Sequence, residues 1–248
     1  MPTFFVSPNS VTLPTIRITG DLLHHLRDSL RLHQGTVLTL NDGCGNRYRA
    51  EVTQITAQAI DSRILDQQTE PTRNTSPIVL GQGLIKGDKM DWVMQKATEL
   101  GVETLVPIHC AHSVVKLNQE RLEHQRSRWE RIVRDAAQQS ERWTIPTIAD
   151  PLELAQICQL YASAPLKAIL TERSSGPSLA TIPLLHDQQQ PIILLVGPEG
   201  GWAETEQRIA QEQGFLSLTL GPRILRAETA AIAALSILQA RLDELKKT

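Results

Sequence analysis

Two apolar segments, each followed by a Gly- and Pro-rich turn, constrain the fold of this chain more than any other feature. Residues 192–196 run into the turn 197–201, and residues 216–220 run into a second turn at 221–222. A short aliphatic segment, a turn and then a helical segment are typical of α/β domains with parallel strands. Ligands bind in such domains at the carboxyl ends of the strands, where helix N-termini leave backbone N–H groups free. The two turns therefore predict one small-molecule site.

The first turn does not match the common phosphate-binding loops. Residues 197–201, Gly-Pro-Glu-Gly-Gly, lack both the Gly-Lys-Ser/Thr ending of a Walker A loop and the G-x-G-x-x-G spacing of a dinucleotide site. Taken alone, this turn is equally compatible with a loop that only needs positive φ angles. The second turn favours a ligand, because it places Arg223, Arg226 and Glu228 between an apolar strand and an Ala-rich helix, where charges need partners.

Other segments of the C-terminal part also fit a parallel α/β domain. Residues 78–85 predict a strand, residues 88–100 a helix with one apolar face, and residues 102–108 a second strand. Such a βαβ unit implies a parallel pair of strands. Residues 118–143 predict a long helix whose interleaved arginines and acids are typical of a solvated face.

The C-terminal helix carries an apolar stripe. Its members recur at helical spacing and are Ala231, Leu235, Leu238, Leu242 and Leu245. Such a stripe must be buried, either in the core of the domain or against a second subunit.

The N-terminal part predicts a small β-barrel with one inserted helix. Strands are expected at 11–18, 36–40, 47–53 and 55–64, and a helix at 22–32 with Asp21 as its cap. Residues 66–77 contain no aliphatic side chain and cannot contribute to a core. We therefore place the boundary there, between a domain of residues 1–70 and a domain of residues 75–248.

Composition excludes several classes of protein. The net charge of −2 does not indicate a polyanion partner, so any nucleic-acid site must be a local patch. The cysteines Cys44, Cys110 and Cys158 match neither a disulfide framework nor a zinc site, so we expect reduced thiols, no metal and a cytoplasmic location. No basic N-terminal region is followed by a long apolar stretch, and we expect neither a signal peptide nor a membrane span.

Three separated motifs resemble one family. The two turns, together with residues 86–102, Lys-Gly-Asp-Lys-Met-Asp-Trp-Val-Met-Gln-Lys-Ala-Thr-Glu-Leu-Gly-Val, are similar to the signature of the RsmE family. Its members are bacterial small-subunit ribosomal RNA methyltransferases of the SPOUT class that methylate uridine at N3. Residues 25–32 are similar to a helix of that family's first domain, so the resemblance covers nearly the whole chain.

The resemblance implies a fold and an activity. The fold would be a small PUA-like β-barrel that binds RNA, followed by an α/β domain whose parallel sheet carries a C-terminal trefoil knot. The activity would be S-adenosylmethionine-dependent methylation of N3 of a uridine in small-subunit ribosomal RNA, on the assembled subunit. The resemblance also implies a homodimer.

The resemblance further implies which residues bind S-adenosyl-L-methionine. They form three walls and are Leu170 and Thr171; Val196, Gly197, Gly200 and Gly201; and Leu220, Gly221, Ile224, Leu225, Arg226, Thr229 and Ala230. Glycines allow close backbone approach to a ligand, which agrees with this assignment. Ala203 stands where relatives have a helix-capping Ser, so we expect Glu204 and Glu206 to support the start of that helix.

Arg226 is the candidate for stabilising the uracil anion that forms when N3 loses its proton. Glu228 would orient Arg226 or act as the base, and pairing inside the protein with Arg223 or Arg226 is an equal alternative. For RNA, the candidates are Arg17, His25, Arg27 and Arg31.

Two other functions stay open on the sequence. The same scaffold fits a non-catalytic RNA-binding factor for ribosome assembly. An α/β enzyme that binds another adenine nucleotide is also compatible with the fold, although the lysine of a phosphate loop is missing.

Overall fold

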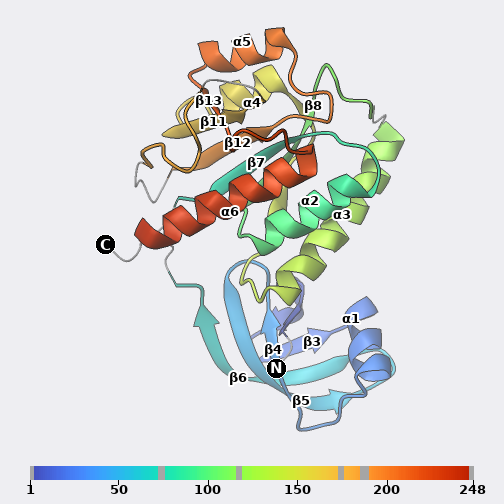
Figure 1. The fold of residues 1–248 in the computed structure, drawn as a ribbon. Coiled ribbons are helices and arrows are strands. Elements are labelled where there is room, and N and C mark those ends of the chain that lie inside the picture. The colour runs from blue at the N-terminus through green and yellow to red at the C-terminus, as the bar shows by residue number, and fades with distance from the viewer. Residues whose placement is uncertain (1–2, 72–75, 116–118, 173–175, 185–189, 246–248) are drawn as a thin grey trace. The chain divides into compact units, whose positions relative to one another are not determined.

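The computed structural model of the 248-residue chain describes residues 3–71, 76–115, 119–172, 176–184 and 190–245. The chain divides into two compact units (Figure 1). Unit 1 comprises Met1–Thr72 and Ala137–Ile145, and unit 2 comprises Arg73–Ala136 and Pro146–Thr248. Residues 137–145, which the sequence places with the second domain, therefore pack with the first unit.

Unit 1 contains a six-stranded sheet with the order β1-β4-β5-β6-β3-β2. The core includes Leu26, Leu40 and Ile60, which are fully buried. The strands are β1 (Thr3–Phe5), β2 (Val11–Thr12), β3 (Thr15–Ile18), β4 (Val37–Asn41), β5 (Asn46–Ile55) and β6 (Ile60–Thr69), and the short helices are η1 (Pro8–Ser10), α1 (Gly20–His24) and η2 (His25–Ser29).

Three local predictions for unit 1 were wrong. Residues 11–18 do not form one strand but an antiparallel hairpin that turns at Leu13-Pro14. The predicted helix at 22–32 begins earlier, with Thr19 as its N-cap, and ends at Ser29. β6 continues to Thr69, into the predicted linker, because these residues find backbone partners along the long strand β5 while their side chains stay in solvent.

Unit 2 is built on a parallel seven-stranded sheet, which confirms the predicted α/β class. Its order is β10-β8-β7-β12-β11-β13, with β9 beside β8. β7 and β8 form the predicted parallel pair. The strands are β7 (Ile78–Gly83), β8 (Thr104–His109), β9 (Thr147–Ile148), β10 (Leu152–Glu153), β11 (Leu166–Leu170), β12 (Ile192–Val196) and β13 (Leu216–Leu218).

Helices cover both faces of this sheet. In Figure 1, α2 (Asp88–Glu99) and α6 (Ala227–Leu245) lie on one face, and α4 (Leu154–Leu160) and α5 (Glu204–Glu212) lie on the other. α3 (Gln119–Gln139) begins in unit 2, and its last residues belong to unit 1. The N-cap of α2 is Gly87, and the helix starts at Asp88 as the sequence predicts. None of the helices in the described ranges is both long and apolar enough for a membrane span.

The apolar stripe of α6 is buried inside this chain. Ala231, Leu235 and Leu238 have no exposed surface, and α6 packs against α2 and β12. The sequence left open whether this stripe is buried in the core of the domain or against a second subunit. The structure places it in the core of the domain.

β12 is the centre of the packing. All five residues of β12 are buried, and Leu195 joins a cluster that includes Ile157 of α4 and Ala210 of α5. A strand that pairs on both edges and is covered on both faces must be apolar at every position, which explains the continuous aliphatic run in the sequence.

We expect Leu195→Ala to lower the free energy of unfolding by about 2–5 kcal/mol, because it leaves a cavity in this core. Leu216→Ala is the matched control: Leu216 lies in β13 of the same sheet but is 49% exposed, and its loss should cost less than about 1 kcal/mol. Denaturant unfolding of both variants measures the difference. Equal losses would contradict the central position of β12.

Candidate functional site

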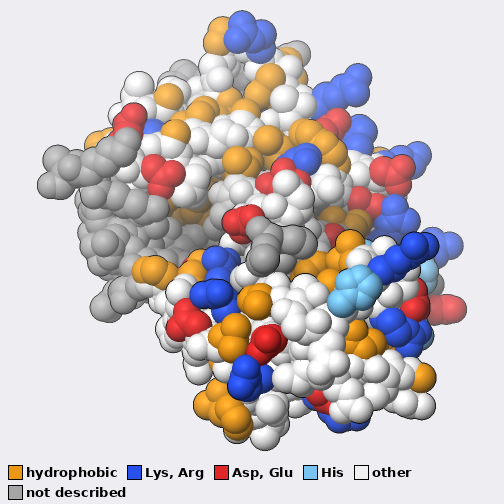
Figure 2. Space-filling model, turned by 90° about the horizontal axis from the view of Figure 1, so that it is seen from below, with side chains coloured by type: hydrophobic (Ala, Val, Ile, Leu, Met, Phe, Trp, Pro, Cys, Tyr) orange, Lys and Arg blue, Asp and Glu red, His pale blue; other side chains and the backbone are white. Residues whose placement is uncertain are grey.

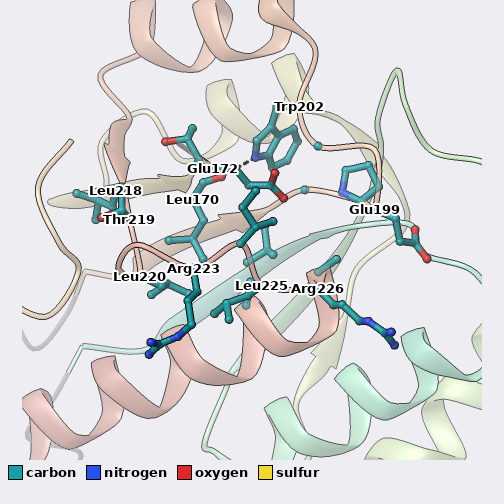
Figure 3. A pocket seen from close by; sticks show the side chains of 18 of the residues that line it. Leu170, Glu172, Glu199, Trp202, Leu218, Thr219, Leu220, Arg223, Leu225 and Arg226 are labelled. Carbon is teal, nitrogen blue, oxygen red and sulfur yellow. Dashed lines mark hydrogen bonds between the residues drawn. The ribbon is translucent and has the colours of Figure 1, made fainter. Parts of the chain in front are cut away.

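A cavity of about 740 Å³ lies at the carboxyl ends of β11, β12 and β13. Three segments supply most of its lining, residues 170–172, 196–202 and 218–227, and Gln207 and Ala230 complete it. Figure 3 shows side chains from these segments around one space. The two turns that the sequence singled out thus face each other across one cavity, because their strands run parallel in the same sheet.

Most of the predicted cofactor residues line this cavity. They are Leu170, Thr171, Val196, Gly197, Gly200, Gly201, Leu220, Gly221, Ile224, Leu225, Arg226 and Ala230. Thr229 does not line it and has an exposed side chain on α6. The sequence analysis did not assign several other lining residues, among them Glu172, Glu199, Trp202 and Arg223. The position of Trp202 directly after the first turn was the signal that could have identified it.

Trp202 joins two walls of the cavity. Its indole Nε1–H donates a hydrogen bond to the carbonyl oxygen of Leu170 at 3.0 Å, and the side chain is 7% exposed. The bond fixes the end of β11 against the turn that follows β12. A buried carbonyl oxygen that lost this donor would carry a desolvation penalty, so the contact holds the wall in place.

Two glycines in the turns have different structural reasons. A Cβ atom at Gly200 would lie 2.8 Å from Cβ of His112, so only glycine allows this close approach of the two loops. The Nδ1 atom of His112 lies 3.1 Å from the carbonyl oxygen of Gly200. Gly221 has open space around it but a φ of +112°, which side chains rarely adopt. One turn thus needs glycine for packing, and the other needs it for its backbone conformation.

Glu206 fastens the loop that forms the second wall. Its carboxylate accepts hydrogen bonds from the backbone N–H groups of Ala203 at 2.8 Å and of Ala111 at 2.9 Å, and the residue is 8% exposed. The expected support for the start of α5 therefore comes from Glu206, which also holds the loop after β8, whereas the Glu204 side chain is exposed.

The two arginines of the second turn leave the wall in different directions. Figure 3 shows Arg226 extending towards the side where Glu199 lies, and Arg223 extending away from it. Both residues are exposed, and within the described residues neither has a carboxylate at ion-pair distance. The guanidinium of Arg226 is thus available to an anionic group at the edge of the cavity.

Glu228 occupies a different environment from the one expected. It lies in the first turn of α6 but does not line the cavity. Its Oε1 atom is 3.8 Å from Nζ of Lys89, and the described residues offer no ion pair between Glu228 and Arg223 or Arg226. The internal partner of Glu228 is therefore Lys89 on α2, which comes from a distant part of the sequence.

Glu199 in the first turn shares this lysine. Its Oε1 atom lies 3.4 Å from Nζ of Lys89 and accepts a bond from the backbone N–H of Lys86 at 3.3 Å. Burial alone would raise the pKa of the Glu199 carboxyl. The backbone N–H groups of Glu199 and Lys86 and the Lys89 ammonium together outweigh burial and hold that pKa below its usual value.

The predicted RNA-binding residues of unit 1 differ in their availability. Arg17 pairs with Asp61 at 3.0 Å, and Arg27 pairs with Asp28 at 2.7 Å. The hydrogen bond from Arg27 lowers the pKa of the Asp28 carboxyl to about 2, with burial opposing the effect.

The other two candidates have no acidic partner in the described part of the chain. His25 meets the ring of Phe4 edge-on at 6.1 Å between centroids, and Arg31 is exposed with a φ of +50°. In Figure 2, Lys and Arg side chains lie among acidic ones rather than in one continuous basic field. The described residues contain no group of three or more His, Cys, Asp or Glu side chains that could hold a metal ion.

Comparison with known protein families and sequences gives two domain matches. An RNA methyltransferase domain matches residues 72–239, and an RNA methyltransferase PUA domain matches residues 18–65. The chain is 30% identical over 237 residues to a ribosomal RNA small subunit methyltransferase E from Bacillus subtilis, covering 94% of this chain and 93% of the relative. A protein of the same name from Synechocystis is 33% identical over 239 residues, covering 96% and 77%.

Solved structures give the same result. A ribosomal RNA small subunit methyltransferase E from Neisseria gonorrhoeae, bound to S-adenosyl methionine, has a TM-score of 0.84 and 32% identity over 97% of this chain and 98% of its own. A protein from Legionella pneumophila, solved with the cofactor SAM, has a TM-score of 0.83 and 32% identity over 96% and 97%.

We expect Glu206→Ala to lower the free energy of unfolding by about 1–3 kcal/mol, because it leaves two backbone N–H groups without their acceptor. Glu204→Ala is the matched control in the same helical turn, where the exposed carboxylate contributes less than about 1 kcal/mol. Denaturant unfolding checks both values. Two equally small losses would show that Glu206 does not fasten the loop.

Proposed function

The chain belongs to the family of ribosomal RNA small subunit methyltransferase E proteins, and from this premise we propose that it methylates N3 of a uridine in small-subunit ribosomal RNA with S-adenosyl-L-methionine as donor. The observation that carries the proposal is the cavity at the ends of β11, β12 and β13. It is built from the turns that carry the family resemblance, and relatives of similar fold were solved with this cofactor.

The cavity fits the proposed cofactor in size and chemistry. A volume of about 740 Å³ lies in the range of cofactor pockets. Its wall combines apolar side chains with backbone polar groups, and within the described residues the buried Thr171 hydroxyl has no hydrogen-bond partner. An unpartnered buried hydroxyl is costly unless a ligand satisfies it. The Glu172 carboxylate in the same wall complements a positively charged sulfonium compound.

We also propose that unit 2 carries a C-terminal trefoil knot. The segment near Leu179 is held against the end of β13, because its backbone N–H donates to Thr219 and the backbone N–H of Thr219 donates to Pro177. Arg241 of α6 donates to the carbonyl oxygens of Leu179 and Ile182. These bonds hold α6 beside a chain segment that precedes β12, and this proximity of distant segments supports the proposal. In the proposed division, residues 1–70 bind RNA and residues 75–248 form the methyltransferase domain.

The proposed chemistry asks three things of this chain. When bound, S-adenosylmethionine supplies a methyl group that its sulfonium already activates. The protein must hold uracil N3 in line with the breaking S–C bond, let the N3 proton leave, and stabilise the charge that develops on the uracil. Transfer forms the N3–C bond and leaves a neutral thioether, while the proton passes to a base or to water.

Arg226 fits the charge-stabilising role. It lines the cavity, its guanidinium is exposed, and in the described part of the chain no acid neutralises it. The structure favours an internal role for Glu228 over that of a base, because Glu228 pairs with Lys89 outside the lining. The proton acceptor for N3 is then water or a group of the RNA complex.

For the RNA, phosphate contacts would position the substrate on unit 1, and the target base would leave its stack to reach the cavity. Arg31 and His25 have no acidic partner among the described residues and can contact phosphate directly. Arg17 and Arg27 would first have to give up their ion pairs with Asp61 and Asp28. Action on the assembled subunit, a homodimer and a cytoplasmic location stay predictions of the resemblance.

Nucleoside mass spectrometry tests the proposed reaction. Small ribosomal subunits lacking the modification are incubated with the protein and cofactor carrying an isotope-labelled methyl group, and we expect labelled 3-methyluridine. Label in another nucleoside would contradict the N3 assignment. Cofactor binding without any labelled RNA would favour the non-catalytic assembly factor. A parallel reaction on protein-free RNA tests the preference for the assembled subunit.

We expect Arg226→Ala to slow methyl transfer by about 100-fold or more, because the developing charge on the uracil loses its cation. Arg208→Ala is the control. Arg208 is exposed on α5, where it pairs with Glu212 at 3.8 Å, and its loss should leave the rate unchanged. Single-turnover rates with saturating cofactor measure both variants. Parental turnover in Arg226→Ala would remove Arg226 from the mechanism.

A further inference from the structure

Lys89 contacts the first turn of the cavity and the helix that follows the second turn, although it lies outside the lining. It sits in the first turn of α2, and its Nζ atom is 3.4 Å from Glu199 and 3.8 Å from Glu228. Glu199 belongs to the turn after β12, and Glu228 follows the turn after β13. One ammonium group therefore connects one wall of the cavity to the start of α6, which continues directly from another wall.

We infer that Lys89 is a positioning residue for methyl transfer: through Glu199 and Glu228 it holds the turn after β12 against the start of α6, which directly follows the other cofactor-binding turn. This inference rests on the proposed function. This clasp sets the distance between the turn after β12 and the start of α6. It also positions the backbone of Arg226, because Glu228 follows Arg226 by only two residues.

Burial distinguishes this contact from an ordinary surface ion pair. The Glu228 side chain is 13% exposed, and its Oε2 atom is buried without a hydrogen-bond partner in the described residues. A carboxylate so far removed from water needs a nearby positive charge. The N-terminal end of α6 offers the Glu228 carboxylate only a partial positive charge, whereas the Lys89 ammonium offers a full unit charge.

Glu199 gives the clasp its second attachment. Its carboxylate accepts from the backbone of Lys86 as well as from Lys89, so the start of α2 and the loop before it hold the first turn at two points. In Figure 3, Glu199 and Arg226 extend to the same side of the cavity. Without Lys89, two carboxylates would remain near each other without their shared cation, and their repulsion would push the turns apart.

A different role for Lys89 is simple stabilisation of α2. Lys96 of the same helix provides the comparison, because it pairs with Glu99 at 2.8 Å, has a similarly exposed side chain and, among the described residues, has no hydrogen bond or ion pair to either turn. A general contribution of a helix lysine would appear equally in variants of Lys89 and Lys96. Only a clasp on the cavity would affect cofactor binding at Lys89 alone.

Calorimetric titration with S-adenosylmethionine tests the inference on the full chain. We expect Lys89→Met to raise the dissociation constant about three- to tenfold, as the loss of two partly buried ion pairs implies. Lys89→Arg should restore most of the affinity, because it keeps the charge, and Lys96→Met should stay within twofold of the parent. Thermal unfolding of each variant shows whether it is folded at the temperature of the titration.

A double-mutant cycle with Glu228→Gln identifies the path of the effect. If Lys89 acts through Glu228, Lys89→Met should weaken binding much less in the Glu228→Gln background than in the parent. Additive effects, or parental affinity in Lys89→Met, would overturn the clasp while leaving the proposed function intact. A parent chain that does not bind the cofactor would instead overturn the proposed function, and the clasp with it.

Discussion

The burial of β12 between β7 and β11 is the constraint on which the rest of the structure depends. All three strands run parallel, so the chain leaves each of them at the same edge of the sheet. Because β12 is covered on both faces, its register cannot slip without exposing aliphatic side chains or burying the polar turn that follows. The cavity exists because this register brings distant turns to one place.

Different groups determine the shape and the charge of this site. The turn after β12 forms its wall through close backbone contacts, with Trp202 bonded to Leu170 and Gly200 packed against His112. Charge lies at the edge: the acids Glu199 and Glu228 are held by Lys89, and Arg226 is left without an acid among the described residues. A cavity shaped by backbone suits a small cofactor that must be enclosed. Charged side chains at its edge suit the approach of a polyanion such as RNA.

The sequence predicted the centre of the fold better than its edges. β12 was placed correctly because a strand buried on both faces has to be a continuous aliphatic run. The strand predicted at 55–64 was placed too early, because the last residues of β6 (Ile60–Thr69) are polar and need only backbone partners. Residues 137–145 were assigned to the wrong unit: Arg47 stacks on Trp143 at 4.0 Å and donates to the carbonyl oxygen of Glu141, contacts that no local pattern reveals.

Contacts between residues far apart in the sequence also explain why the partner of Glu228 was not predicted. All the cofactor residues that the resemblance implied, except Thr229, line the cavity, because glycine turns are recognisable as short motifs. The resemblance did not identify the partner of Glu228, since Lys89 reaches that carboxylate only through the packing of α2 against α6. A charge in a loop next to a buried strand signals that a partner exists, but its identity depends on which helix covers that edge of the sheet. In such a site, the sequence motif is therefore enough to predict which backbone turns form the cavity. Which charged side chains pair with one another depends on how the helices pack.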